Sequence, residues 1–371
     1  MKKVNGFELI QLFEQFSPKE YAMEGDKIGL QIGCLNKPIE NVMIALDVLE
    51  NVVDEAIEKN VQLIIAHHPP IFRPLQKLVT DTTQGRMLEK LIKHDIAVYA
   101  AHTNLDVAPG GVNDLLAQAL ELENVQLLSP TYETKLKKLV VFVPHTHSTA
   151  VREALGNAGA GAIGNYSHCT FTSEGTGSFL PGENTNPYIG KQGEIESVSE
   201  ERIETIFPAS IEKRVLTAML KAHPYEEVAF DIYPLANKGE ELGLGRIGTI
   251  EETTLSEFAQ YVKQVFGLSG VRVVGDLNAK VKKVAVLGGD GGKYWSQAKF
   301  KGADVYVTGD MYYHVAHDAM LAGLNIVDPG HHVEMVMKQG VTNVLTNMCN
   351  EKGYEVNIFP SELVTDPFQF L

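Results

Sequence analysis

The sequence has few cysteines and no long hydrophobic stretch. Its 371 residues include three cysteines, Cys34, Cys169 and Cys349, which lie far apart and form no Cys-x-x-Cys pair. This pattern argues against a disulfide framework and a cysteine-based zinc site, and it is typical of a protein in a reducing compartment. No stretch approaches the roughly 18 apolar residues of a membrane-spanning helix, so we expect no membrane association.

Positive charge is also scarce. Lys and Arg number 32 against 47 Asp and Glu, which gives a formal net charge of −15. The phosphate backbone of a duplex repels such a chain, so nucleic acid is not an expected partner. The first residues, through Glu8, Gln11 and Glu14, contain no apolar core of a signal peptide. We therefore expect a cytoplasmic protein, with two or three domains at roughly 150 residues per domain.

Short apolar runs alternate with amphipathic segments in both end regions of the chain, which is typical of parallel α/β structure. The same spacing separates Asp47 from His67 and Asp290 from Asp310. We interpret this as two related α/β halves, duplicated around one metal cleft. The expected strands are 41–48, 62–66 and 96–101 in the first half, and 283–287, 303–308 and 324–327 in the second.

A middle segment has a different character. Its apolar patterns follow the order β-α-β-β-α-β, which is typical of a ferredoxin-like α+β domain. We expect helices over 149–157 and 212–222, and a short strand over 166–170. The sequence thus predicts a discontinuous α/β domain formed by 1–129 plus 239–371, with 130–238 inserted into it.

Histidines and carboxylates cluster where expected strands end. His67 and His68 end one strand before two prolines, and His102 ends the next strand, four residues before Asp106. The last strand of the second half is followed by Gly330–Glu334, which contains His331, His332 and Glu334. Ligands of open α/β sheets bind at the carboxyl ends of strands. Imidazole and carboxylate together suit zinc, iron, manganese, cobalt or nickel.

This set exceeds what one tetrahedral ion needs. Two ions roughly 3.5 Å apart, bridged by a carboxylate and a water, would use all of it. The strongest ligand candidates are His68, Asp106 and either His331 or His332, while Asp106 or Glu334 best suits the bridge. Such ions would lower the pKa of a water and make it a nucleophile at neutral pH. Residues that could support the ligands are Thr103, Asn104 and Asp310.

Two glycine-rich stretches carry weaker signals. Gly159–Gly164 fits the G-x-G-x-x-G pattern, but a helix precedes it, so a flexible turn explains it better than dinucleotide binding. Gly288–Gly292 follows a strand and precedes a helix. Its backbone N–H groups could hold a substrate phosphate, or the stretch could be only a tight turn. Asp26 is in a turn-like segment, where a structural aspartate is the default interpretation, and the alternative is a residue that supports the ligands or contacts the substrate.

Four motifs in this order resemble those of the GTP cyclohydrolase I type 2 homologues, the Ngg-interacting-factor-three-like family. They are Gly25–Leu30, Ala66–Pro70, His102–Asp106 and Gly330–Glu334. The resemblance covers essentially the whole chain. Gly159–Gly190 together with His223–Glu227 looks like the inserted domain of the long form of that family, which is similar to the trimeric CutA and PII signalling proteins.

The resemblance implies a dinuclear site with two divalent ions per chain, of which zinc, iron or manganese are the main candidates. The implied ligands are His67, His68, Asp106, His331 and Glu334, with His102 lining the site as a possible acid or base. It also implies a toroidal homohexamer. Its name implies conversion of GTP.

Two classes of function follow from these expectations. The first is a metal-dependent hydrolase that acts on a GTP-like nucleotide or a phosphoester through a metal-activated water. The second is a non-catalytic metal- or ligand-binding protein or regulatory scaffold, in which the inserted domain acts as a sensor or assembly element. Metal-dependent turnover that disappears in His68→Ala would favour the first class over the second.

Overall fold

The computed structural model of the protein describes residues 2–371, which form two compact units. The first unit contains the chain up to Tyr132 together with Leu242–Leu371, and the second contains Glu133–Glu241. Each unit has a hydrophobic core of its own. Among the described residues, no helix combines the length and the apolar character needed to cross a membrane.

A five-stranded sheet forms the first half of the first unit, in the order β17-β4-β5-β6-β2. Four of its strands are parallel and β2 is antiparallel at one edge. All residues of β5 are buried, because a parallel sheet is covered on both faces. The strands are β2 (Gly29–Ile32), β4 (Asn41–Ala45), β5 (Leu63–Ala66), β6 (Ala97–Ala100) and β17 (Asn357–Pro360).

A six-stranded sheet forms the second half, in the order β13-β16-β15-β14-β12-β7. Its strands β14, β15 and β16 are parallel, as are β4, β5 and β6 in the first half. The strands are β7 (Glu123–Glu133), β12 (Glu241–Thr254), β13 (Arg272–Val274), β14 (Lys280–Asp290), β15 (Val305–Gly309) and β16 (Asn325–Asp328).

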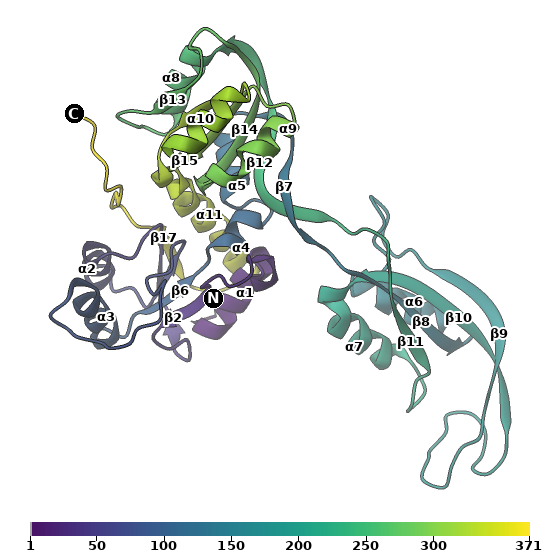
Figure 1. The fold of residues 1–371 in the computed structure, drawn as a ribbon. Helices are drawn as coiled ribbons and strands as arrows, with labels where there is room; N and C mark the ends of the chain where they lie inside the picture. Colours follow the sequence, from purple (N-terminus) through teal and green to yellow (C-terminus); the bar gives the residue numbers. More distant parts are fainter. Residues whose placement is uncertain (1) are drawn as a thin grey trace. The chain divides into compact units, whose positions relative to one another are not determined.

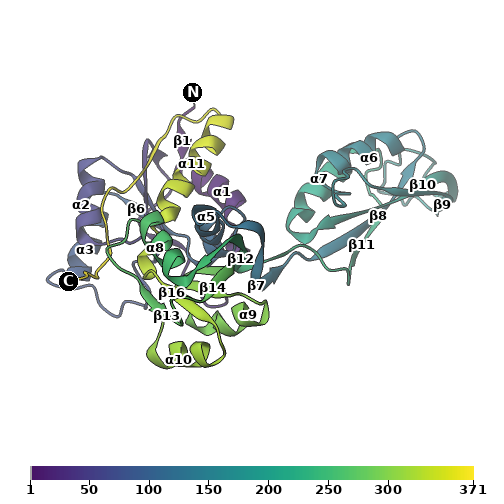
Figure 2. The same cartoon turned by 90° about the horizontal axis from the view of Figure 1, so that it is seen from above.

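One layer of helices is shared by the two halves. It consists of α1 (Gly6–Phe16), α5 (Val112–Ala119), α8 (Leu255–Val265) and α11 (Val336–Glu351), whose buried side chains join one core cluster with both sheets. Figure 2 shows α11 beside α1 and α5. The outer faces are covered by α2 (Glu50–Glu58) and α3 (Thr83–Lys93) in the first half, and by α9 (Trp295–Phe300) and α10 (Tyr313–Leu321) in the second.

The second unit is a four-stranded antiparallel sheet with two helices on one face (Figure 1). Its elements follow the order β-α-β-β-α-β. The strand expected over 166–170 is wrong: Ile163 and Tyr166 pair in a tight bridge, and the strand begins at Phe171. The elements are β8 (Leu136–Pro144), α6 (Ser148–Asn157), β9 (Phe171–Phe179), β10 (Glu196–Pro208), α7 (Glu212–Ala222) and β11 (Phe230–Pro234).

Candidate metal centre

The sequence-predicted histidines and carboxylates meet at the carboxyl ends of strands in the first unit. His67 and His68 follow β5, and His102 follows β6. Asp106 lies in the short helix α4 (Thr103–Val107), while Glu334 lies in the 3-10 helix η4 (His331–Met335). Their potential ligand atoms form three overlapping groups, each within 4.8 Å: His67, His68 and His102; His68, His331 and Glu334; and His67, Asp106 and Glu334.

His67 is completely buried, and its ring is fixed by the backbone. Its Nδ1 lies 3.0 Å from the carbonyl oxygen of Ala101, and because that oxygen can only accept, Nδ1 donates. Nδ1 is thereby occupied, so Nε2 is the ring nitrogen that can offer a lone pair to a metal ion. This atom faces Asp106 Oδ1 and Glu334 Oε2, each at 3.6 Å. His67 is therefore positioned by its backbone contact to act as a metal ligand.

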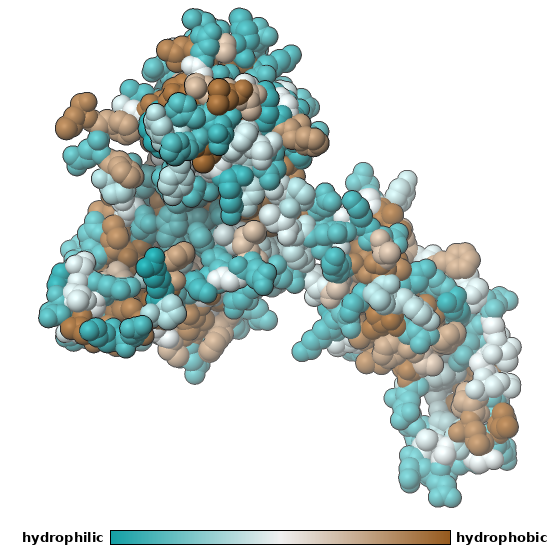
Figure 3. All heavy atoms as spheres, viewed as in Figure 1, coloured by the Kyte–Doolittle hydropathy of each residue, from teal (hydrophilic) through white to brown (hydrophobic). Residues whose placement is uncertain are grey.

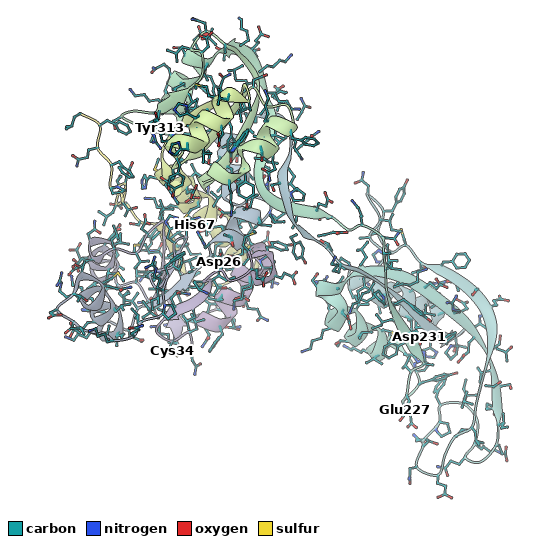
Figure 4. All side chains as sticks on the ribbon, viewed as in Figure 1. Asp26, Cys34, His67, Glu227, Asp231 and Tyr313 are labelled. Carbon is teal, nitrogen blue, oxygen red and sulfur yellow. The ribbon has the colours of Figure 1, made fainter. Side chains whose placement is uncertain are left out.

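The other three imidazoles are each held by a carboxylate behind them. This arrangement fixes the ring orientation, leaves Nε2 available and raises the basicity of the ring, which is common around metal-binding histidines. Figure 4 shows that Asp26 and His67 belong to the same region of the first unit. The Nδ1–carboxylate pairs are His68–Asp47 at 2.7 Å, His102–Asp26 at 2.9 Å and His331–Asp310 at 2.7 Å.

Glu334 is the centre of the cluster. Its buried Oε2 lies 3.1 Å from His68 Nε2, 3.2 Å from His331 Nε2 and 3.6 Å from His67 Nε2. One carboxylate thus contacts histidines from both halves of the unit. Gly289 makes room for it, because a Cβ there would lie 2.6 Å from Glu334 Oε1, and its φ of +62° also favours glycine.

This packing also decides the role of Gly288–Gly292. Gly288 and Gly289 belong to β14, and the N–H groups of Gly288, Gly291 and Gly292 donate to side-chain oxygens of the protein. Their acceptors are Asn113, Thr308 and Asp290. A phosphate loop needs free N–H groups, so the expectation of an anion-binding loop is not supported. The glycines instead allow the close approach of Glu334.

The electrostatics of the cluster favour positive charge. Burial alone would lower the pKa of His68, but Asp47 and Glu334 raise it to about 10. Glu334 is also the main cause of the raised pKa of His331, which is about 9. Burial raises the pKa of Asp106, whereas the surrounding imidazoles hold the pKa of Glu334 well below its usual range despite burial. A bound metal cation would balance the carboxylates in place of protons on the imidazoles.

Two buried polar atoms provide a test of whether the residues fit a metal ion. His67 Nε2 and Asp106 Oδ1 have no hydrogen-bond partner among residues 2–371. Buried polar atoms normally have partners, since leaving one without costs about 1–3 kcal/mol. His67 Nε2 lies 3.6 Å from Asp106 Oδ1 and 3.6 Å from Glu334 Oε2. The nitrogen and oxygen donors suit a first-row divalent ion, so the residues fit the implied metal.

The structure distinguishes His331 from His332. His331 belongs to a potential ligand group, whereas His332 belongs to none and has a buried Nε2 without a partner among the described residues. The expected support from Asn104 is wrong, because its amide donates to Ser17 instead. Asp47 was missed as a support, whereas Asp26, for which support of the ligands was the alternative to a structural turn, holds His102. For Asp47 a signal existed, since its distance to His68 along the chain equals that of Asp310 to His331.

The cluster opens into a cleft of about 1000 Å³ within the first unit. Its walls include Lys293, Tyr294 and Phe72, and the C-terminal residues Thr365–Phe368. The recess visible in the first unit in Figure 3 is bordered by mostly hydrophilic residues. Thr365 donates its hydroxyl to Asp47, so the C-terminal segment contacts the carboxylate that holds His68. The cleft is large enough for a nucleotide-sized molecule.

A family model described as Duf34/NIF3 (NGG1p interacting factor 3) matches residues 4–367. The chain belongs to this family. The resemblance found in the four motifs is thereby confirmed. The matched residues include both units of the chain.

Relatives and solved structures agree over the full length. The chain is 66% identical over 371 residues to the GTP cyclohydrolase 1 type 2 homolog of Bacillus subtilis (strain 168), with 100% of both chains covered. It is 60% identical over 372 residues to the homolog of the same name from Halalkalibacterium halodurans, again with 100% of both covered. The crystal structure of a Bacillus cereus protein related to NIF3 has 63% identity and a TM-score of 0.96, covering 100% of each chain.

Proposed function

We propose that the protein binds two divalent metal ions and uses them for hydrolysis of a GTP-like nucleotide or a phosphoester. The observation that carries this proposal is the pair of unpartnered buried atoms, His67 Nε2 and Asp106 Oδ1, beside Glu334. The first ion would be held by His67, Asp106 and Glu334, and the second by His68, His331 and Glu334. The three overlapping groups of potential ligands support this division.

The chain's own residues would provide orientation and proton transfer. Bound metal would supply Lewis acidity and lower the pKa of a water molecule in the cleft. His102 is held at Nδ1 by Asp26, so its Nε2 is the atom that would take or give a proton. Lys293 lines the same cleft and would attract an anionic substrate. The relatives' names contain GTP cyclohydrolase 1, which motivates GTP as the first substrate to examine.

The decisive experiment is the metal content per chain of protein purified without a histidine tag. We expect about two ions per chain in the wild type and about one in Asp106→Ala, because Asp106 belongs only to the ligand group of the first ion. His314→Ala is the matched control, because His314 is an exposed histidine of α10 outside every potential ligand group. No ion even after reconstitution would overturn the proposal. Metal without turnover of GTP or phosphoesters would leave a metal-binding or regulatory scaffold, the second class considered from the sequence.

We also propose that the chain assembles into a homohexamer and that the second unit is a CutA/PII-like domain. Large exposed apolar side chains support assembly, including Phe300 at 92%, Leu321 at 82% and Tyr313 at 73% exposure. The order of elements in the second unit supports the domain type. Light scattering of the intact protein at several concentrations tests the assembly, and a monomer at all concentrations would contradict it.

A further inference from the structure

The second unit contains a cavity of about 590 Å³ that the proposed metal chemistry does not use. Helices α6 and α7 pack on one face of the sheet through Val141 and Ile203. The cavity lies on the other face, where the side chains of Phe142, Glu200 and Arg202 emerge. The loop between β9 and β10 and the turn before β11 complete it. Figure 4 shows Glu227 of that turn beside this loop.

A buried carboxylate forms the polar centre of the cavity. Glu200 is only 7% exposed, and its Oε1 accepts a hydrogen bond of 2.9 Å from the hydroxyl of Tyr225. Glu200 lines the cavity, and its other oxygen, Oε2, is not among the fully buried side-chain atoms of the described residues that have no partner. This atom points across the sheet toward Gly177, where a Cβ would lie 2.2 Å away. A mostly buried carboxylate that lines a cavity favours a ligand that donates N–H groups or carries positive charge.

Aromatic rings surround this carboxylate. The centroid of Tyr225 lies 6.2 Å from that of Phe179 and 6.2 Å from that of Tyr188. Burial and the neighbouring Glu200 raise the pKa of Tyr225, so its hydroxyl remains a donor. Figure 3 shows hydrophobic residues gathered near the β9–β10 hairpin. Ring faces are electron-rich and attract cations within about 6 Å, and they also stack on planar groups.

The net charge of the lining distinguishes between ligand classes. Besides Glu200, the lining contains Glu174, Glu226 and Glu227, and its single basic residue is Arg202. Arg202 is already paired with Glu204 of the same strand, so its charge is compensated. The remaining charges of the lining give the cavity a negative electrostatic potential. It attracts cations and opposes phosphate groups, which disfavours a nucleotide.

The walls are held in place without a ligand. The loop between β9 and β10 is fixed by a hydrogen bond from the N–H of Asn186 to Glu226, and by another from Gln192 to the carbonyl of Thr185. Gly175 lies opposite Glu200 in the β9–β10 ladder, and a Cβ there would meet no atom within 4 Å. The absence of a side chain at this position therefore keeps the cavity open beside the carboxylate.

We propose that this cavity binds an organic cation: an amine, amidine or guanidine group carried on a planar or hydrocarbon body. The cationic group pairs with Glu200 Oε2, and the body lies among Phe179, Tyr188 and Tyr225. The residues that form this site all belong to the second unit. The site is independent of the metal centre, and its ligand does not need to be a substrate.

Calorimetric titration of the full-length protein tests the proposal with benzamidine, which carries an amidinium on an aromatic ring, and with its neutral isostere benzamide. We expect saturable binding of benzamidine. The affinity for benzamide should be weaker by roughly ten- to a hundredfold, because benzamide lacks one charge-assisted hydrogen bond. Glu200→Gln should weaken benzamidine binding by a similar factor, because it removes the negative charge. The amide oxygen can still accept the hydrogen bond from Tyr225, so the local packing is kept. Chelator-treated protein should bind benzamidine equally well.

Two further variants make the test independent of folding defects. Gly175→Val should abolish binding by filling the cavity without a change of charge, while the melting temperature stays near that of the wild type. Glu183→Gln is the control, because Glu183 is exposed in the same loop but does not line the cavity. Equal affinity for benzamide and benzamidine, or no benzamidine binding at millimolar concentration, would overturn the proposal. ATP binding that Glu200→Gln strengthens would also overturn it, in favour of a nucleotide site.

Discussion

The two halves of the first unit place a histidine at the end of a strand in the same way. Asp47 holds His68 and Asp310 holds His331, both at 2.7 Å and both from 21 residues earlier in the chain. Strands β4 and β15 precede the two aspartates, and strands β5 and β16 precede the two histidines. One local arrangement thus occurs twice, and the two imidazoles it positions lie 3.3 Å apart at Nε2.

Beyond this shared arrangement the halves differ. The first half adds three further ligand candidates, His67, His102 and Asp106, and all of these depend on buried contacts. The second half adds Glu334, with two glycines of β14 that make room for it. The comparison teaches that a repeated arrangement accounts for the scaffold and one pair of supported histidines, whereas the proposed two-ion site depends on the differences between the halves.

The largest expected effect concerns the carboxylate that joins the halves. Glu334→Gln should remove the ions of both halves, because Oε2 contacts histidines from each. His331→Ala should leave about one ion per chain, the ion proposed to be held by His67, Asp106 and Glu334. Elemental analysis after dialysis measures both. If Glu334→Gln retained as much metal as wild type, Glu334 would not be a shared ligand.

The supporting aspartates should differ in importance. Loss of such a partner typically weakens metal affinity about 10- to 100-fold. We expect Asp47→Asn to lie at the upper end and Asp310→Asn at the lower end, because the Asp47 side chain is 27% exposed and that of Asp310 is 38% exposed. Competition with a fluorescent chelator measures the affinity, with the exposed Asp318→Asn as control. The opposite order would show that burial does not set the difference.

A smaller effect is expected from the C-terminal segment, whose Thr365 contacts Asp47 of the first half. Thr365→Val removes the hydroxyl that donates to Asp47 while keeping the shape of the side chain. Asp47 then loses one of its two partners, and we expect metal affinity to fall severalfold, less than in Asp47→Asn. The same chelator competition measures it. Thr342→Val, which alters a hydroxyl bonded within α11, is the control.

The smallest effect concerns the scaffold of the second half and depends on pH. At the start of α8, Glu257 accepts hydrogen bonds from the N–H and hydroxyl of Thr254 and from the hydroxyl of Thr253. These bonds lower the pKa of Glu257 from 4.5 to about 2. The start of α2 has no side-chain cap of this kind. A lowered carboxyl pKa stabilises the fold above the unfolded value of 4.5, and this contribution disappears as the pH falls toward 2. Glu257→Gln should therefore lower the melting temperature by a few degrees at pH 7.

That difference should shrink as the pH falls below 4.5, and metal content at pH 7 should remain that of wild type. A difference in melting temperature that did not depend on pH would contradict the assigned cap. Exposed Glu251→Gln is the control, because it precedes the capping residues and has no part in the box.

Local patterns were sufficient to predict many of the elements. The expected strands at 41–48 and 62–66 correspond to β4 and β5, and the expected helices at 149–157 and 212–222 correspond to α6 and α7. These predictions succeed because runs of buried residues and amphipathic periodicity are properties of the sequence itself. The strand over 166–170 failed, since a short polar turn and a short strand have similar local composition.

The sequence by itself determined which side chains lie at the ends of the strands, because the residues that follow a strand are known once its end is predicted. Only the tertiary structure decided which of these side chains meet. It separated His331 from His332 and directed Asn104 to Ser17. It also placed Asp26 behind His102, 76 residues away in the chain. Such contacts depend on the packing of distant segments, and no local pattern of residues specifies them.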